Sequence, residues 1–171
     1  GGNAKPTGSS PVNRLGPLPL DRDHVTALLP HRPPMLMLDG VTELIAGQHA
    51  RGFKLLADGE PWVQGHFPGN PVMPGVLILE SLAQLGAVLA LATEPLDPAR
   101  CDFVFLGVDK AKFTRPIRPG ERLDLDVTVL QQRGGTWKLL GEATVAGQRC
   151  AQAELLTAIL PRQPSPPRRE S

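Results

Sequence analysis

One long apolar run stands out, directly after a stretch rich in proline and glycine. From Val76 to Leu91 the only charged residue is Glu80, and the other polar side chains are those of Ser81 and Gln84. A helix that is apolar on nearly all sides is buried on nearly all sides. Its length of about 24 Å is short for a membrane span. The pattern therefore predicts a buried central helix that begins near residue 74.

The segments on both sides of this helix read as strands joined by glycine turns. Alternating or short apolar runs between turn residues predict strands over 35–44, 48–56, 102–108, 122–132, 136–145 and 148–160. A short helix capped by Asp21 is expected to end near Leu29, before Pro30. This order predicts an α+β fold in which one curved antiparallel sheet wraps the long helix. Because one sheet cannot cover every side of that helix, we expect a dimer.

Composition sets the limits of the domain and excludes some functions. The chain has 171 residues, a formal net charge of +1 and two cysteines. Polar, proline-rich tails are expected to be disordered over 1–20 and 162–171, which leaves one domain over 21–161. The near-neutral charge argues against nucleic-acid binding. No signal-peptide or membrane-spanning pattern occurs, so we expect a cytoplasmic protein without membrane insertion.

Two side chains carry candidate chemistry. Glu80 is a lone carboxylate in an apolar helix, where it must be paired, protonated or functional, and Gln84 one turn later could bond to it. His66 lies in the rigid segment GHFPGNPVMPG. Together they make a plausible acid/base pair at neutral pH. Gly75 at the helix start could offer its N–H to a developing oxyanion. The alternative is that proline and glycine there only mark the junction between loop and helix.

Long segments of the chain carry a family resemblance. GHFPGNPVMPGVLILESLAQ resembles the signature of the β-hydroxyacyl-acyl-carrier-protein dehydratases of bacterial type II fatty-acid synthesis. LLPHRPPMLMLD at 28–39, FLGVDKAKFTRPIRPGERL at 105–123 and RGGTWKLLGEATVAGQ at 133–148 resemble further segments of that family. The likeness covers roughly residues 20–160. It implies a hotdog fold, a homodimer that commonly assembles into a trimer of dimers, and active sites at the dimer interface.

The resemblance also implies a mechanism. His66 from one subunit would take a proton from the carbon next to the thioester of a (3R)-hydroxyacyl chain, while the Gly75 N–H holds the thioester oxygen. Glu80 from the other subunit, or a water that it holds, would protonate the departing hydroxyl, a role for which apolar burial favours the protonated acid. Phe67 and Gln84 are expected to contact the substrate. No metal or organic cofactor is expected beyond the phosphopantetheine arm that carries the substrate.

A local group of basic residues indicates the partner. It comprises Lys110, Lys112, Arg115, Arg118 and Arg122, with Glu121 as the acidic residue among them. By charge alone this is an ordinary solvated turn. With the resemblance, it becomes the expected docking surface for the acidic acyl carrier protein.

Three alternatives remain open at this point. A dual dehydratase–isomerase would carry Asp at the position of Glu80. A hotdog thioesterase would use a carboxylate on the same helix but would not need the GHFPG segment. A non-catalytic hotdog subunit of a synthase would usually lack the pair that His66 and Glu80 form here.

Overall fold

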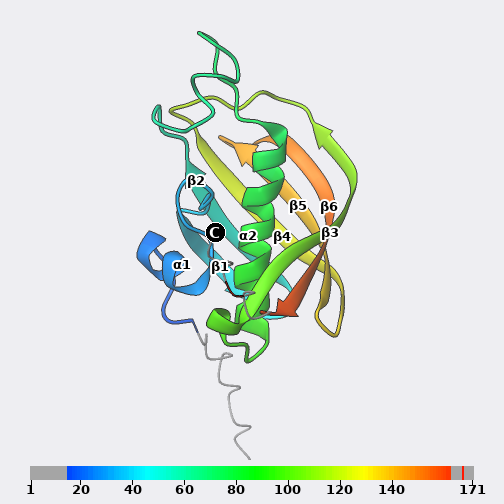
Figure 1. Ribbon diagram of the computed structural model, residues 1–171. Helices are drawn as coiled ribbons and strands as arrows, with labels where there is room; N and C mark the ends of the chain where they lie inside the picture. Colours follow the sequence, from blue (N-terminus) through cyan, green and yellow to red (C-terminus); the bar gives the residue numbers. More distant parts are fainter. Residues whose placement is uncertain (1–14, 163–166, 168–171) are drawn as a thin grey trace, which may run out of the picture.

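The protein is built from one long helix and one antiparallel sheet (Figure 1). The computed structural model describes residues 15–162 and residue 167. Over these residues the elements are α1 (Arg22–Leu28), β1 (Gly40–Ile45), β2 (His49–Leu55), α2 (Gly75–Thr93), the short 3-10 helix η1 (Pro98–Arg100), β3 (Cys101–Phe113), β4 (Arg122–Arg133), β5 (Thr136–Val145) and β6 (Gln148–Pro161). The six strands lie in the order β1-β2-β4-β5-β6-β3 and curve around α2. The expected α+β architecture and element order are confirmed.

Two strands differ from the sequence-based expectation. The first begins at Gly40 instead of Met35, because Met37 and Leu38 donate their backbone N–H groups to the side chain of Gln84 and not to a neighbouring strand. β3 extends to Phe113, five residues beyond the expected end, and absorbs register shifts near its middle against β6. Glycine and charged residues in this stretch interrupt the apolar alternation, which is why the pattern underestimates its length.

Close packing between α2 and the sheet depends on small residues. A Cβ atom on Gly86 of α2 would lie 2.4 Å from the Leu139 side chain of β5. One on Gly141 of the same strand would lie 2.9 Å from Leu82. By length and composition α2 could cross a membrane, with a mean hydropathy of 1.9, yet 67% of that window is buried inside the protein. It is therefore the core helix of the domain, as expected.

The first turn of α2 and the outermost strand leave apolar side chains uncovered. Val76 is 71% exposed although it opens the apolar run. Within the described part of the chain β3 pairs only with β6 and lies at the edge of the sheet. Its exposed apolar residues are Phe105, Leu106, Val108 and Phe113.

The expected N-terminal tail is shorter than predicted. Leu20 is buried, and its backbone pairs with Val41 of β1, so this residue belongs to the domain. Its apolar side chain packs in the core. The polar composition of the preceding residues led the sequence analysis to place Leu20 in the tail. Residues 1–14, 163–166 and 168–171, on which the expectation of disordered tails mainly falls, lie outside the described residues.

Candidate active site

The loop before α2 fixes the orientation of His66. The backbone N–H of His66 donates to the carbonyl oxygen of Trp62 at 2.9 Å, and that of Val72 donates to the carbonyl oxygen of His66 at 2.7 Å. The His66 Nδ1 atom lies 2.7 Å from the carbonyl oxygen of Val72. A carbonyl can only accept, so Nδ1 carries the hydrogen and Nε2 is left as the basic nitrogen. The Phe67 ring stacks on the imidazole with 4.3 Å between ring centres.

His66 and Gly75 line the same cavity, which has a volume of about 360 Å³. Its other walls are mainly apolar and come from the loop, from α2, from the end of β3 and from the segment after it; they include Val72, Met73, Ile78, Phe113 and Ile117. The loop is attached to that segment by a hydrogen bond from the Met73 N–H to the Ile117 carbonyl oxygen, 2.8 Å long. His66 and the start of α2 therefore face the same space.

Gly75 opens α2 under the ring of Phe113. No side chain caps this helix terminus, because its N-cap residue is Pro74. The Gly75 N–H is therefore available to a ligand oxygen at the positive end of the helix. A Cβ atom on Gly75 would lie 2.9 Å from the Phe113 ring. Glycine at this position therefore lets the ring cover the helix start.

Glu80 lies among polar partners that the sequence only partly predicts. Its Oε1 atom accepts from Gln84 Nε2 at 3.1 Å, as expected, and lies 3.2 Å from His31 Nε2. Gln84 is 1% exposed, and it also donates to Met35 O and accepts from two backbone N–H groups. These contacts indicate that Gln84 positions Glu80; its expected contact with substrate stays a prediction.

The ionisation of Glu80 differs from the expectation. Burial acts to raise the pKa of this carboxyl, as the apolar run suggests. Hydrogen bonds from His31 and Gln84, with the charge of His31, outweigh burial and hold the pKa below its ordinary value. Apolar burial therefore favours the protonated acid, as expected, but the contacts with His31 and Gln84 favour the ionised form more strongly in the single subunit, and the sequence argument did not include His31.

His66 and Glu80 do not meet within one chain. Glu80 is absent from the walls of the cavity that His66 and Gly75 line, and no hydrogen bond or ion pair joins the two side chains among the described residues. Five residues along a helix turn the side chain by about 140°, so Gly75 and Glu80 face different directions. A single chain thus presents the two candidate groups at separate places.

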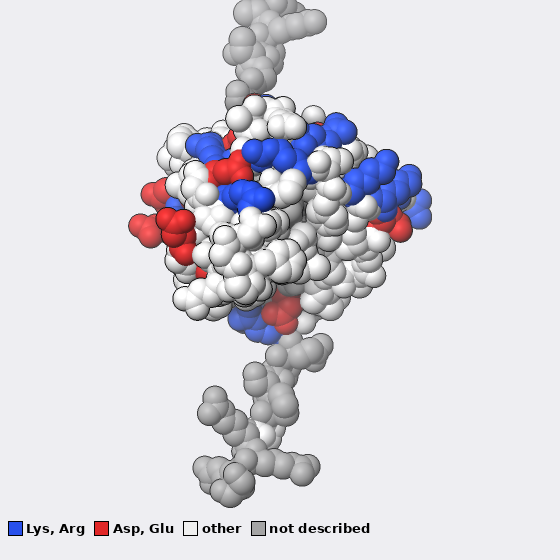
Figure 2. Space-filling model, turned by 90° about the horizontal axis from the view of Figure 1, so that it is seen from above, with Lys and Arg blue, Asp and Glu red and all other residues white. Residues whose placement is uncertain are grey.

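The expected basic group lies at the end of the molecule where α2 begins. Figure 2 shows lysine and arginine side chains gathered over this end, with acidic side chains beside them. Lys112 is exposed and forms no ion pair among the described residues, whereas Lys110 lies 3.4 Å from Glu154. The remaining members also bind locally.

Two of the three arginines in this group contact the segments around the cavity, and the third contacts the strands beside it. Arg115 lines the cavity and pairs with Glu121 at 2.7 Å. Arg118 donates to Asn70 Oδ1 at 2.5 Å and so connects the segment after β3 to the loop that holds His66. Arg122 pairs with Asp124 at 3.0 Å, and its guanidinium lies 4.0 Å from the centre of the Phe53 ring.

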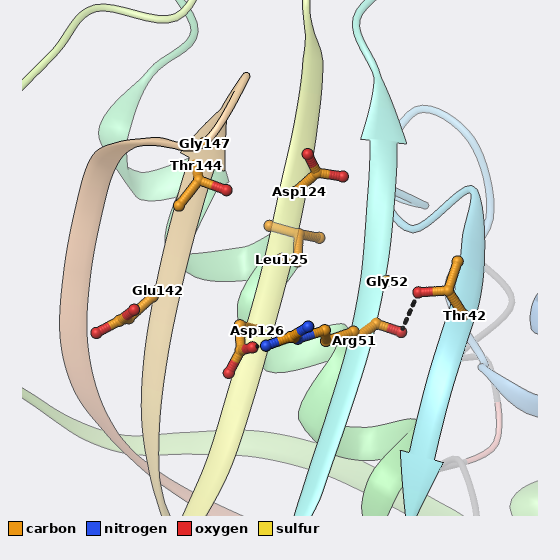
Figure 3. Close-up of a pocket in the computed structure, with 9 residues that line it drawn as sticks. All are labelled: Thr42, Arg51, Gly52, Asp124, Leu125, Asp126, Glu142, Thr144 and Gly147. Carbon is orange, nitrogen blue, oxygen red and sulfur yellow. Dashed lines mark hydrogen bonds and ion pairs between the residues drawn. The ribbon is translucent and has the colours of Figure 1, made fainter.

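A second cavity, of about 380 Å³, lies on the face of the sheet that points away from α2 (Figure 3). Its side chains alternate along the strands with the buried core residues, which places them on the opposite face. Arg51 donates to Asp126 at 2.8 Å across this cavity. It contains none of the predicted site residues. The described part of the chain holds no group of three His, Cys, Asp or Glu side chains suited to a metal ion.

Sequence reasoning missed His31 and Phe113 as neighbours of the site. Both lie inside segments that carry the family resemblance, but their contacts depend on how distant segments pack. His31 reaches Glu80 across 49 residues, and Phe113 reaches Gly75 across 38. No local pattern encodes such contacts. The sequence signal for both residues was that they lie in segments that resemble the family.

Comparison with solved structures defines the fold class. The dehydratase heterocomplex ApeI:P from Xenorhabdus doucetiae matches 82% of this chain and 91% of its own, with a TM-score of 0.63 and 22% identity. A hypothetical thioesterase from Streptococcus pneumoniae, solved with coenzyme A, matches 72% of this chain and 87% of its own with a TM-score of 0.53 and 10% identity. At these identities the likeness concerns the fold alone, which is the hotdog fold.

Sequence comparison then gives the family. Residues 29–154 match the family described as FabA-like domain. The 3-hydroxyacyl-[acyl-carrier-protein] dehydratase FabZ of Sorangium cellulosum is 51% identical over 154 residues, which cover 90% of this chain and 99% of that protein. The enzyme of the same name from Myxococcus xanthus is 47% identical over 82% of this chain and 92% of its own. The chain therefore belongs to the FabA-like domain family, and the relatives described above are FabZ dehydratases of that family.

Proposed function

We propose that this protein removes water from 3-hydroxyacyl groups on acyl carrier protein during fatty-acid synthesis, which gives a trans-2-enoyl thioester. The observation that carries the proposal is His66, which bonds through Nδ1 to the loop and presents Nε2 in an apolar cavity at the uncapped start of α2. Relatives about half identical over most of the chain are named as enzymes of this activity.

In this reaction His66 is the base. Its Nε2 takes a proton from carbon 2 of the acyl chain, and the electron pair of that bond forms the double bond to carbon 3. Negative charge develops on the thioester oxygen as the proton leaves. The Gly75 N–H, at the positive end of α2, donates to that oxygen.

Glu80 is the acid. It gives a proton to the hydroxyl that leaves carbon 3 as water. At the end of the reaction His66 has gained one proton and Glu80 has lost one. The reactive pair must therefore hold a single proton, on Glu80 when His66 is neutral. Burial against a second subunit would remove solvent from the carboxyl and so oppose the low pKa that it has in one chain.

The pair is completed by a second copy of the chain. The unpaired edge of β3 and the exposed apolar side chains of β3 and Val76 form a surface that a second copy would cover. A two-fold axis at that surface would repeat every contact twice and give two identical sites. His66 of one copy and Glu80 of the other would then share each site. Assembly of three such dimers is a further expectation.

The substrate arrives on a carrier. Lys112, free of ion pairs among the described residues, lies with Lys110, Arg115, Arg118 and Arg122 at the end of the molecule that holds the cavity. An acidic acyl carrier protein would be attracted to this end, and its phosphopantetheine arm would bring the acyl chain to His66. The chain itself then needs no cofactor. We place this reaction in the cytoplasm, where two buried free cysteines are stable.

The direct test is the reverse reaction. Hydration of a crotonyl thioester removes the enoyl-thioester absorbance, and wild type, His66→Ala and Glu80→Gln are compared. Activity in wild type alone supports the proposal. No activity on acyl-carrier-protein or coenzyme A thioesters of several lengths would indicate a non-catalytic subunit. A cis-3-enoyl product would indicate a dehydratase–isomerase, and release of free thiol without dehydration would indicate a thioesterase.

A further inference from the structure

The two oxygens of the Glu80 carboxyl have different surroundings. Oε1 lies 3.1 Å from Gln84 Nε2 and 3.2 Å from His31 Nε2. Oε2 has no hydrogen-bond partner among the described residues, and the side chain remains 20% exposed. One oxygen is therefore held by the protein and the other is open.

His31 presents a ring nitrogen to Glu80. Its Nε2 faces Oε1 of Glu80, while its Nδ1 is buried and has no hydrogen-bond partner among the described residues. The tautomer with hydrogen on Nε2 satisfies the contact with Glu80 and leaves only a weaker, unpaired acceptor.

The surroundings of this contact are simple. Gln84 acts on Glu80 from α2 itself, and His31 acts on it from the segment between α1 and β1. Arg32, the charged residue next to His31, directs its guanidinium to the carbonyl oxygens of Leu29 and His31 instead. In the proposed dimer, the further titratable group that faces Glu80 is His66 of the second copy.

We propose that His31 is a positioning residue: with Gln84 it holds Oε1 of Glu80, and this leaves Oε2 as the oxygen that exchanges its proton with the substrate. The inference rests on the proposed dehydratase function. Removal of the His31 donor should both loosen the carboxyl and destabilise its ionised form. The pKa of Glu80 should then move upward.

Three variants test this role. His31→Leu removes the donor, and His31→Gln keeps an N–H donor on a side chain that does not titrate. His24→Leu removes an exposed histidine whose ring contacts Asp21 and not Glu80, so it is the matched control. We expect kcat to fall about ten- to a hundredfold in His31→Leu, with a smaller change in KM, and to recover in part in His31→Gln.

The pH profile separates positioning from a general loss of structure. Because carboxyls titrate below imidazoles, the acid limb of kcat/KM reports Glu80. This limb should move to higher pH in His31→Leu, return toward wild type in His31→Gln and stay unchanged in His24→Leu. An acid limb in His31→Leu at the wild-type position would overturn the inference.

A second readout does not depend on activity. The pKa of Glu80 can be followed through its carboxyl carbon by NMR in protein labelled with carbon-13 glutamate, and Glu80→Gln assigns the signal. A rise in this pKa in His31→Leu supports the contact, and an unchanged value contradicts it. Inactive wild-type enzyme would instead refute the dehydratase function, while this titration would still decide the role of His31.

Discussion

The Nδ1 atom of His66 lies 2.7 Å from the carbonyl oxygen of Val72, and the N–H of Val72 donates back to the carbonyl oxygen of His66. This reciprocal contact fixes the ring and its tautomer before any substrate binds. It makes Nε2 the nitrogen that can accept a proton at once. A preorganised base of this kind is what proton abstraction next to a thioester requires.

His66→Asn should remove the base and keep the loop. The asparagine amide can still donate to the Val72 carbonyl oxygen, but it has no basic nitrogen. We expect thioester hydration to fall about 10²- to 10⁴-fold while the melting temperature stays close to that of wild type. The rate is measured by the loss of enoyl-thioester absorbance. Activity near the wild-type value would show that another group is the base.

Gly75→Ala should disturb the start of α2. The new methyl group would lie 2.9 Å from the Phe113 ring and would displace it. We expect a loss of about 1–3 kcal/mol in the free energy of unfolding, with a drop in activity. Both are measured by thermal unfolding and by the hydration assay.

The partner variant Phe113→Leu makes this prediction specific. A smaller side chain leaves room for the methyl group, so Gly75→Ala combined with Phe113→Leu should be more stable than the sum of the single changes predicts. Strict additivity would show that the ring contact does not explain why position 75 is glycine.

Lys112→Glu should weaken the use of the carrier protein and spare the chemistry. We expect KM for an acyl-carrier-protein substrate to rise about tenfold at low salt and the difference to shrink as salt is added. KM for a free thioester without the carrier protein should change little. Arg133→Glu, at the exposed end of β4 opposite Arg122, is the control of equal charge change. Equal effects of the two variants would contradict docking at the proposed surface.

Asp126→Asn should make stability depend less on pH. Burial acts to raise the pKa of Asp126. Hydrogen bonds and charge from His49 and Arg51 outweigh burial, so the pKa of this carboxyl is below its ordinary value. Figure 3 shows the contact between Arg51 and Asp126. Such a carboxyl stabilises the folded chain above the pKa of the unfolded chain, and the benefit disappears as the pH falls through the folded pKa.

We therefore expect Asp126→Asn to cost about 1 kcal/mol at pH 7 and the difference from wild type to shrink below about pH 4. Urea unfolding at several pH values measures it. A difference that stays constant down to pH 3 would show that ionisation of Asp126 is not the cause.

Periodicity predicted most of the fold because the chain follows its local rules closely. The run from Val76 to Leu91 became the core helix, and the glycine turns became the turns between the strands. The strand expected from Met35 failed because a distant side chain, Gln84, takes the backbone hydrogen bonds of that segment. Long-range contacts of this kind leave no mark on a local pattern.

The candidate site divides in the same way. His66, Gly75 and Glu80 could be singled out by residue type and surroundings, and the resemblance supplied their roles. The ionisation of Glu80 could not be predicted, because it depends on His31 from a segment that only folding brings close. The separation of His66 from Glu80 within one chain likewise could not be predicted, because it depends on which face of α2 packs beside His66 and which face carries Glu80.

The central claim is that His66 of one copy works with Glu80 of another, and mixing inactive variants tests it most directly. Purified His66→Ala and Glu80→Gln proteins are unfolded together, refolded and assayed for thioester hydration. A mixed dimer would contain one site with both residues intact, so random pairing should restore about a quarter of the wild-type activity. Activity no higher than that of either variant alone, with mixed dimers shown to be present, would contradict the account.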